Sequence, residues 1–453
     1  MGRLFGTDGV RGTAGVAPLD KTTVRRLGAA LAQVLRGNAS VGGSETPRVL
    51  AGRDTRESGP WIEEELAFGM AQRGVTLVSA GVVPTPAVAY LTPKLGFVAG
   101  VVISASHNPF ADNGIKVFSS AGEKFTDTLE RQVEAIVADA SWSLPGDPPA
   151  RVEHADFTEP YLEHLAGMLR AHVSGAPSRL VIDCANGATT TIAPRLFERL
   201  GIEVHVIGAE PDGRNINLHC GSTAPARLAQ AVVDGGYPLG VAFDGDGDRA
   251  IFVDHTGRVV DGDAVMLMCA KQMKVDGRLA GNGVVATVMS NLGLELALRD
   301  AGIDMVRTAV GDKYVMEEMS RRGLVLGGEQ SGHIIFGEYL STGDGLATAL
   351  NVLRTMETTG RTLSDLASDM TAYPQVLLNV RVREKRELAS VPEIAALMAD
   401  IEQRLAGTGR LLVRYSGTEP LLRVMLEGAN EAEIRGWGQE IIDAATQHLG
   451  SGV

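Results

Sequence analysis

Apolar runs and helical patterns alternate along most of the chain in a unit that occurs three times. Each unit has an apolar run typical of a buried strand, then helical spacing, a turn with glycine, and a second apolar run. The three units span residues 48–81, 179–208 and 283–311. Two strands joined through a helix form a parallel βαβ crossover. The pattern therefore predicts three similar α/β domains with mixed, mainly parallel sheets.

The last part of the chain follows a different pattern. Residues 375–382 and 410–416 alternate apolar and polar positions, residues 391–406 and 431–449 have helical spacing, and residues 421–428 resemble another strand. This order predicts a C-terminal α+β domain with a largely antiparallel sheet covered by helices on one face. Proline-rich or turn-forming stretches suggest the domain boundaries. The predicted domains are residues 1–150, 151–255, 256–371 and 372–453.

Length and charge narrow the class of protein. At about 150 residues per domain, a chain of 453 residues is too long to fold around a single hydrophobic core. A formal net charge of −13 argues against nucleic acid or an anionic membrane as the main partner. Three cysteines without C-x-x-C spacing suit a reducing compartment, and the N-terminus lacks the apolar segment of a signal peptide. We therefore expect a cytoplasmic protein with no nucleic-acid partner and no membrane partner.

Three aspartates alternate with glycine between two apolar runs, at Asp244, Asp246 and Asp248. Three carboxylates this close repel one another unless a cation binds, and hard oxygen ligands suit Mg²⁺. A calcium EF-hand loop is the rival interpretation, but it needs glycine and glutamate where Arg249 and His255 stand. An acidic surface turn is the plain alternative. The spacing favours a metal site.

A second polar cluster follows the apolar run 101–103, which is typical of a buried strand. In open α/β sheets, ligands bind at the carboxyl ends of the strands. The cluster holds Ser104, Ser106 and His107, and Lys116 follows. A hydrolase would present G-x-S-x-G here, which is absent. Neighbouring loop residues rarely face each other, so His107 is a poor base for Ser106. Fixing the loop by a hydrogen bond is an equally good role for His107, and Lys116 suits proton transfer or phosphate contact.

Three further loops carry polar groups. Glu329, Ser331 and His333 lie in one glycine-rich loop whose donors and acceptors suit a sugar. The turn after residue 414 offers hydroxyls and backbone N–H groups for a phosphate, flanked by two arginines. Its residues are Arg414, Ser416, Gly417, Thr418 and Arg423. Arg11 lies in a glycine-rich loop and suits an anion. One reaction uses all five loops: phosphoryl transfer on a phosphosugar, through an enzyme phosphoserine and Mg²⁺.

With these motifs in this order, the whole chain resembles the α-D-phosphohexomutase superfamily. The resemblance implies four domains around a central cleft, with the first three α/β and alike. It implies that Ser106, which precedes His-Asn-Pro, carries the phosphoryl group, a choice over Ser104 that spacing alone does not make. It also implies that phosphorylated Ser106 shares Mg²⁺ with Asp244, Asp246 and Asp248, and that Arg11 and Lys116 assist proton transfer.

The motifs GEQSGH and VGDKYV resemble the glucosamine branch of that superfamily. The mannose and glucose enzymes tend to have methionine at Gln330 and histidine at Asp312, so a histidine acid/base is not carried over to Asp312. The branch implies interconversion of glucosamine 6-phosphate and glucosamine 1-phosphate through a 1,6-bisphosphate, on the route to UDP-N-acetylglucosamine and cell-wall precursors. Glucosamine 1,6-bisphosphate or glucose 1,6-bisphosphate would be the activator.

Alternatives remain open from the sequence. A mutase for glucose or mannose phosphates shares nearly every motif, and a non-catalytic phosphosugar sensor would bind without using phosphorylated Ser106. A Ser-His hydrolase ranks last. The expected partner is the phosphosugar substrate, and a homodimer is compatible with the chain, whose sequence fixes no oligomeric state.

Overall fold

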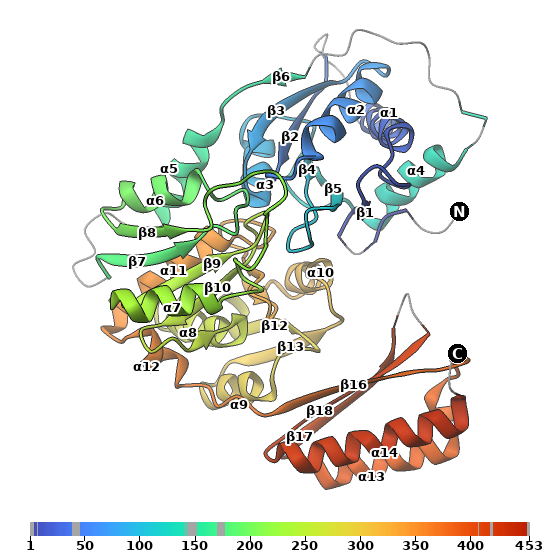
Figure 1. Cartoon of the computed structure of the whole chain (residues 1–453), viewed down its shortest axis with the longest axis vertical. Helices are drawn as coiled ribbons and strands as arrows, with labels where there is room; N and C mark the ends of the chain where they lie inside the picture. Colours follow the sequence, from blue (N-terminus) through green and yellow to red (C-terminus); the bar gives the residue numbers. More distant parts are fainter. Residues whose placement is uncertain are drawn as a thin grey trace. The chain divides into compact units, whose positions relative to one another are not determined.

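The structure is a computed structural model that describes residues 4–6, 8–38, 46–139, 141–142, 152–169, 177–405, 407–416 and 420–450. The chain divides into two compact units. Unit 1 comprises Met1–Met289 and Ile303–Asp369, and unit 2 comprises Ser290–Gly302 and Met370–Val453. Unit 1 holds three sheets and unit 2 holds a fourth (Figure 1). None of the described helices combines the length and the apolar character that a membrane span requires.

The first sheet has six strands in the order β1-β5-β4-β2-β3-β6, with helices on both faces. Its strands β2, β3, β4 and β6 are parallel, and β5 runs antiparallel to both β4 and β1. The elements are β1 (Val10–Thr13), α1 (Lys21–Asn38), β2 (Arg48–Arg53), α2 (Gly59–Ala71), β3 (Thr76–Val82), α3 (Thr85–Lys94), β4 (Ala99–Ile103), β5 (Asp112–Ser119), α4 (Asp127–Ala138) and β6 (Glu153–His154).

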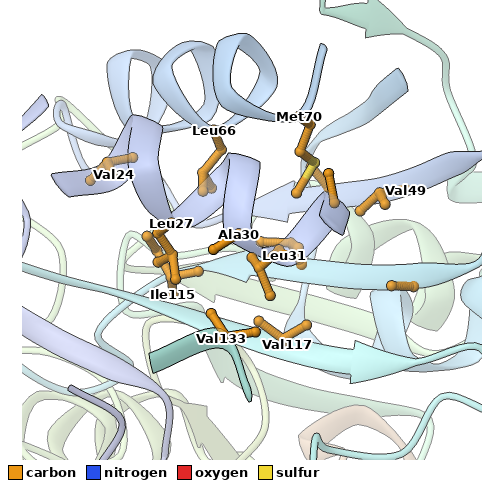
Figure 2. Packing of buried hydrophobic residues seen from close by; sticks show 14 of the residues in the cluster. Val24, Leu27, Ala30, Leu31, Val49, Leu66, Met70, Ile115, Val117 and Val133 are labelled. Atoms are coloured by element: carbon orange, nitrogen blue, oxygen red, sulfur yellow. The ribbon is translucent and has the colours of Figure 1, made fainter. Parts of the chain in front are cut away.

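Helices pack on both faces of this sheet. Apolar residues of α1, α2 and α4 pack on alternate residues of the strands; Figure 2 shows Leu27 and Leu31 above Ile115 and Val117. The opposite face carries α3, which approaches closely because Gly100 has no side chain. A Cβ there would lie 2.4 Å from Thr92 Oγ1. The first sheet is therefore the middle layer of an α/β/α sandwich.

The second and third sheets repeat the mixed arrangement. Their strand orders are β11-β10-β9-β7-β8 and β13-β12-β14-β15, and in each the central strands are parallel. The second group is α5 (Thr158–Met168), β7 (Arg179–Asp183), α6 (Ile192–Arg199), β8 (Glu203–Ile207), α7 (Ala226–Gly235), β9 (Leu239–Phe243), β10 (Ala250–Asp254) and β11 (Val259–Val260). The third is α8 (Gly262–Val275), η1 (Ala280–Asn282), β12 (Gly283–Thr287), β13 (Asp304–Thr308), α10 (Asp312–Arg322), β14 (Leu326–Gly328), β15 (Ile334–Phe336), α11 (Gly345–Thr359) and α12 (Leu363–Ala367).

Unit 2 is an antiparallel three-stranded sheet with the order β16-β18-β17. Alternate strand residues such as Val376, Val413 and Val424 form one core with the two long helices, so those helices cover one face of the sheet. The elements are α9 (Leu292–Asp300), β16 (Gln375–Arg381), η2 (Leu388–Ser390), α13 (Pro392–Leu405), β17 (Gly409–Tyr415), β18 (Leu421–Gly428) and α14 (Glu431–Leu449).

The predicted fold class is confirmed. Each of the three predicted βαβ units forms a parallel strand pair, namely β2–β3, β7–β8 and β12–β13. Two short edge strands extend the sheets past the predicted boundaries, since β6 pairs in the first sheet and β11 in the second. A two-residue strand shows no alternation that a sequence pattern could reveal. The turn at 255–257, expected to separate domains, closes the β10–β11 hairpin.

Candidate active site

Three predicted motifs occupy equivalent places in unit 1. In each of its sheets the parallel strands end in an antiparallel hairpin: β4–β5, β9–β10 and β14–β15. The loop of the first hairpin holds Ser106, the second holds the three aspartates, and the third holds Glu329, Ser331 and His333. The repeat seen in the sequence therefore places one polar loop at the same point of each sheet.

Ser106 lies directly against the acidic loop. Its hydroxyl donates to Asp244 Oδ2 at 2.5 Å, and both residues are buried. The loops meet closely because residue 245 is glycine, where a Cβ would lie 2.5 Å from the Ser106 carbonyl oxygen. Ser106 itself has a left-handed φ of 52°, which is unusual for a residue with a side chain. The second serine, Ser104, instead donates to Asp54 and accepts the Ser106 backbone N–H at 2.9 Å.

The three aspartates fit a divalent cation. One carboxylate oxygen from each lies within 4.8 Å of the others, and all three residues are buried. Asp246 Oδ1 and Asp248 Oδ1 accept no hydrogen bond from any described residue. Burial, followed by the charges of Asp248 and Asp246, raises the pKa of Asp244 well above its usual range. Crowded buried carboxylates with unused oxygens are the donor set that a hard metal ion satisfies.

Lys116 lies on β5 and reaches the same aspartates. Its Nζ is 2.9 Å from Asp246 Oδ2, 3.2 Å from Asp248 Oδ2 and 3.1 Å from Asp8 Oδ2. Burial alone would lower the pKa of Lys116, but these carboxylates outweigh burial and raise its pKa well above the ordinary value. The three carboxylates therefore favour the charged form of the amine, at the position where the sequence predicted a residue for proton transfer or phosphate contact.

A chain of alternating charges continues from Lys116 across the first and third sheets. Asp8 also receives Arg11 Nη2 and Lys124 Nζ, and Lys124 also donates to Asp312. His333 Nε2 lies 3.5 Å from Asp312 Oδ2 and accepts the Gly343 N–H, while His333 Nδ1 lies 3.6 Å from Asp248. Arg11 and His333, predicted as site residues, thus belong to one buried network with the acidic loop.

His107 does face its neighbour, contrary to expectation. Its Nδ1 lies 3.4 Å from Ser106 Oγ, but also 3.0 Å from Arg249 Nη1. Burial, together with the charges of Arg249 and Arg11, lowers the pKa of His107 to about 4. Because the hydroxyl of Ser106 donates to Asp244 and the arginine points at Nδ1, the contacts fit loop fixation rather than the base of a hydrolase.

The sugar-like loop is held at both ends. Glu329 Oε1 accepts the N–H of Gly311 at 3.1 Å, and Ser331 Oγ is 3.5 Å from Glu329 Oε2. Gln330 Nε2 donates to Asp261 Oδ2 at 3.0 Å. The Ala250 N–H donates to the Gly332 carbonyl, which ties this loop to the metal hairpin. Ser331 is exposed and Glu329 is half-buried, so both remain within reach of a ligand.

In unit 2, two predicted arginines are direct partners across the sheet. Arg414 on β17 pairs with Arg423 on β18, and Asn379 of β16 extends the row. They alternate with the residues of the helix-covered core, so they lie on the face of the sheet opposite α13 and α14. Like charges directly opposite one another are unfavourable without an anion. Ser416 is buried and its carbonyl accepts Lys385 Nζ at 2.6 Å; Gly417 and Thr418 lie outside the described residues.

Several polar residues of the site were missed by the sequence analysis. Asp8 binds three cations, Arg249 lies between the aspartates and His107, and Arg56 donates to the carbonyl of Ser106. Asp54 and Arg56 follow the apolar run of β2 directly, at the same carboxyl end of the sheet as Ser106. Their position at the carboxyl end of a predicted strand was the sequence feature that could have identified them.

Comparison with known proteins gives concordant matches along the chain. Models of the phosphoglucomutase/phosphomannomutase family match at residues 2–143 (alpha/beta/alpha domain I), 159–257 (domain II), 261–373 (domain III) and 377–444 (C-terminal domain). A protein named phosphoglucosamine mutase from Solibacter usitatus is 50% identical over 99% of both chains. One of the same name from Syntrophotalea carbinolica is 48% identical over 99% of this chain and 98% of its own.

A solved structure supports the same architecture. The phosphoglucomutase/phosphomannomutase family protein from Burkholderia thailandensis superposes with a TM-score of 0.80 at 25% identity, over 99% of this chain and 98% of its own.

Proposed function

This chain belongs to the phosphoglucomutase/phosphomannomutase family, and we propose that it interconverts glucosamine 6-phosphate and glucosamine 1-phosphate through a phosphoserine at Ser106. The observation that carries the proposal is the Ser106 hydroxyl held 2.5 Å from Asp244 within a cluster of three aspartates. The choice of glucosamine rests on full-length relatives named phosphoglucosamine mutase. The reaction is an isomerisation by intramolecular phosphotransfer, with net movement of the phosphate from one sugar oxygen to another.

In the first half-reaction the phosphoryl group leaves Ser106 for the free anomeric hydroxyl of glucosamine 6-phosphate. The Ser106 O–P bond breaks and a sugar O–P bond forms; the sugar hydroxyl loses its proton as Ser106 Oγ gains one, which gives the 1,6-bisphosphate, and the second half reverses this proton exchange at sugar oxygen 6. The sugar then turns around, and Ser106 Oγ takes the phosphoryl group from position 6. The serine is phosphorylated again and glucosamine 1-phosphate departs, so the two halves balance.

Asp244, Asp246 and Asp248 are the residues that would hold Mg²⁺ beside the phosphorylated serine. Mg²⁺ bound there would neutralise negative charge on the transferring phosphoryl group. The chain itself keeps the nucleophile and these carboxylates in register through the Ser106–Asp244 contact and the close approach at Gly245. Glucosamine 1,6-bisphosphate or glucose 1,6-bisphosphate would load a serine that carries no phosphate.

Proton transfer at the reacting hydroxyl belongs, in this proposal, to the group formed by Lys116, Arg11 and Asp8. All three are joined by direct ion pairs next to the aspartates. His107 fixes the serine loop through its contact with Arg249.

Substrate binding is assigned to two sets of residues. Glu329, Ser331 and His333 would recognise sugar hydroxyls, because they offer both acceptors and donors. The loop with Arg414, Ser416, Gly417, Thr418 and Arg423 would hold the phosphate that does not react. If this site binds the phosphate in the same way whether it is on oxygen 1 or oxygen 6 of the sugar, the bisphosphate can bind in both orientations.

The domain limits 1–150, 151–255, 256–371 and 372–453 remain part of this proposal. Each segment supplies the central strands of one sheet, which supports them. A homodimer and a cytoplasmic location also stay predictions; light scattering and fractionation would test them.

The deciding experiment is phosphate mapping by mass spectrometry, with and without excess glucosamine 6-phosphate and Mg²⁺. We expect a phosphate on the peptide that holds Ser106, exchanging with the sugar and absent from S106A. A protein that stays unmodified after priming with glucose 1,6-bisphosphate would contradict the phosphoserine route. Comparison of kcat/KM for glucosamine, glucose and mannose 6-phosphates then tests the choice of sugar.

A further inference from the structure

Arg56 is a buried guanidinium whose every N–H group is used. Its side chain has no exposed surface. Nε donates to Asp54 Oδ2 at 2.8 Å, and the remaining four N–H groups all meet backbone carbonyls. Nη2 donates to the carbonyls of Ser106 at 2.9 Å and Asn108 at 2.8 Å, and Nη1 donates to those of Pro109 and Asp112.

These four carbonyls outline the turn between β4 and β5 that presents Ser106. Such a turn points several carbonyl oxygens inward, and each of them needs a donor once water is excluded. Arg56 supplies the donors from the centre of the turn. The turn must also keep Ser106 at a left-handed φ of 52°, a conformation that persists only when the surroundings enforce it.

A second contact fixes the same residue from its amide side. Asp54, which pairs with Arg56, accepts the hydroxyl of Ser104 at 2.5 Å, and that hydroxyl in turn accepts the Ser106 N–H at 2.9 Å. Both the N–H and the carbonyl of Ser106 are therefore tied to one buried ion pair. The second sheet adds Asn217, whose Nδ2 donates to the Ser106 carbonyl at 2.9 Å.

We infer that Arg56 is a positioning residue for phosphoryl transfer: it holds the Ser106 backbone so that Oγ stays beside Asp244 with or without its phosphoryl group. The inference rests on the proposed function, since it concerns the same serine. It also requires arginine in particular. A lysine ammonium has three donors and no planar fork, so it can satisfy Asp54 and at most two carbonyls. R56K keeps the buried charge but loses the geometry.

The test compares R56K with R26K. Arg26 is a matched control in the same sandwich, because its guanidinium also donates to four backbone carbonyls, those of Ile136, Val137, Asp139 and Trp142. Those carbonyls lie at and beyond the end of α4, outside the site described above. The readouts are kcat, KM for glucosamine 6-phosphate, melting temperature, and the rate at which glucose 1,6-bisphosphate loads Ser106.

We expect R56K to lower kcat and the loading rate together, by on the order of 10²-fold, with KM nearly unchanged. R26K should lower the melting temperature without changing either rate. Loading in R56K at the wild-type rate would overturn the inference, as would equal loss in both variants. If R56K does not fold, D54N decides: it keeps Arg56 but removes the carboxylate that pairs with Nε and accepts the Ser104 hydroxyl, and an unchanged loading rate would overturn the inference. Failure of the wild type to load Ser106 would instead refute the proposed function.

Discussion

The acidic centre of unit 1 and the arginine pair of unit 2 solve opposite electrostatic problems. In the acidic centre (Ser106, Lys116, Asp244, Asp246 and Asp248), buried charges of both signs already contact one another. In the arginine pair (Arg414 and Arg423), two like charges that are each half-buried lie opposite one another, on the sheet face away from α13 and α14. The first is preorganised by its own ion pairs, and the second is the region proposed to bind the phosphate that does not react.

The difference indicates what each region contributes. Preorganised charges act on the transition state, because their reorganisation cost is met during folding. The proposed contact of Arg414 and Arg423 with the non-reacting phosphate would be the same in the ground state and the transition state, and so would govern KM. Changes to the acidic centre should therefore lower kcat, and changes to the arginine pair should raise KM.

The largest effect is expected from D246N. The substitution removes one of the three carboxylates proposed to bind Mg²⁺ and leaves an amide as the partner of Lys116. We expect kcat to fall by about 10³-fold or more. Chelation with EDTA should inactivate the wild type, with recovery on addition of Mg²⁺. D234N on the exposed surface of α7 is the control. Full activity of D246N in EDTA would show that the acidic centre works without a metal.

The next effect is expected from K116M. Methionine keeps an unbranched chain out to the ε position but removes the ammonium that Asp8, Asp246 and Asp248 share. We expect a decrease in kcat of about 10²-fold or more, the range of acid–base groups, with a small change in KM. Steady-state kinetics at saturating Mg²⁺ measure both. A rise in KM alone would place Lys116 among the binding residues and blur the contrast between the two regions.

A smaller effect, on the other side of the contrast, is expected from R423A. Loss of a charged donor to phosphate should raise KM about 10- to 100-fold and leave kcat within a few-fold. R435A on α14, an exposed arginine paired with Glu431, is the matched control in the same unit. A fall in kcat with unchanged KM would contradict the division of labour argued above.

The sequence predicted the strands and loops better than the contacts between them. Asp244, Asp246 and Asp248 were identifiable because their spacing is local, within one hairpin loop, whereas the choice of Ser106 over Ser104 came from the family resemblance. Asp8 and Arg56 were not identifiable, because their partners are distant in the sequence. Asp8 pairs with Lys116, more than a hundred residues away, and Arg56 donates to Ser106, fifty residues away. Periodicity reports which face of an element is buried, whereas ion pairs between sheets depend on tertiary packing.

The smallest expected effect is a change in stability at Asp344, a carboxyl group buried next to the acidic loop. Asp344 caps α11 and accepts the Tyr161 hydroxyl at 2.8 Å, and the next residue, Gly345, donates its N–H to Gly247 of that loop. Burial raises the pKa of Asp344 from 3.8 to about 6. The folded protein therefore binds more protons than the unfolded chain between pH 4 and 6, so this carboxyl loses its stabilising effect as the pH rises through that window.

D344N should remove that pH dependence, because the amide keeps a cap oxygen but has no proton to lose. The melting temperature of D344N relative to the wild type should therefore rise by a few degrees between pH 4.5 and pH 7.5. D261N is the control, since Asp261 caps α8 in the same way but is only half-buried. A difference that stays constant with pH would mean that Asp344 ionises as readily inside the protein as outside. Burial of the Asp344 charge beside the acidic loop would then have no measurable effect on the stability of the protein.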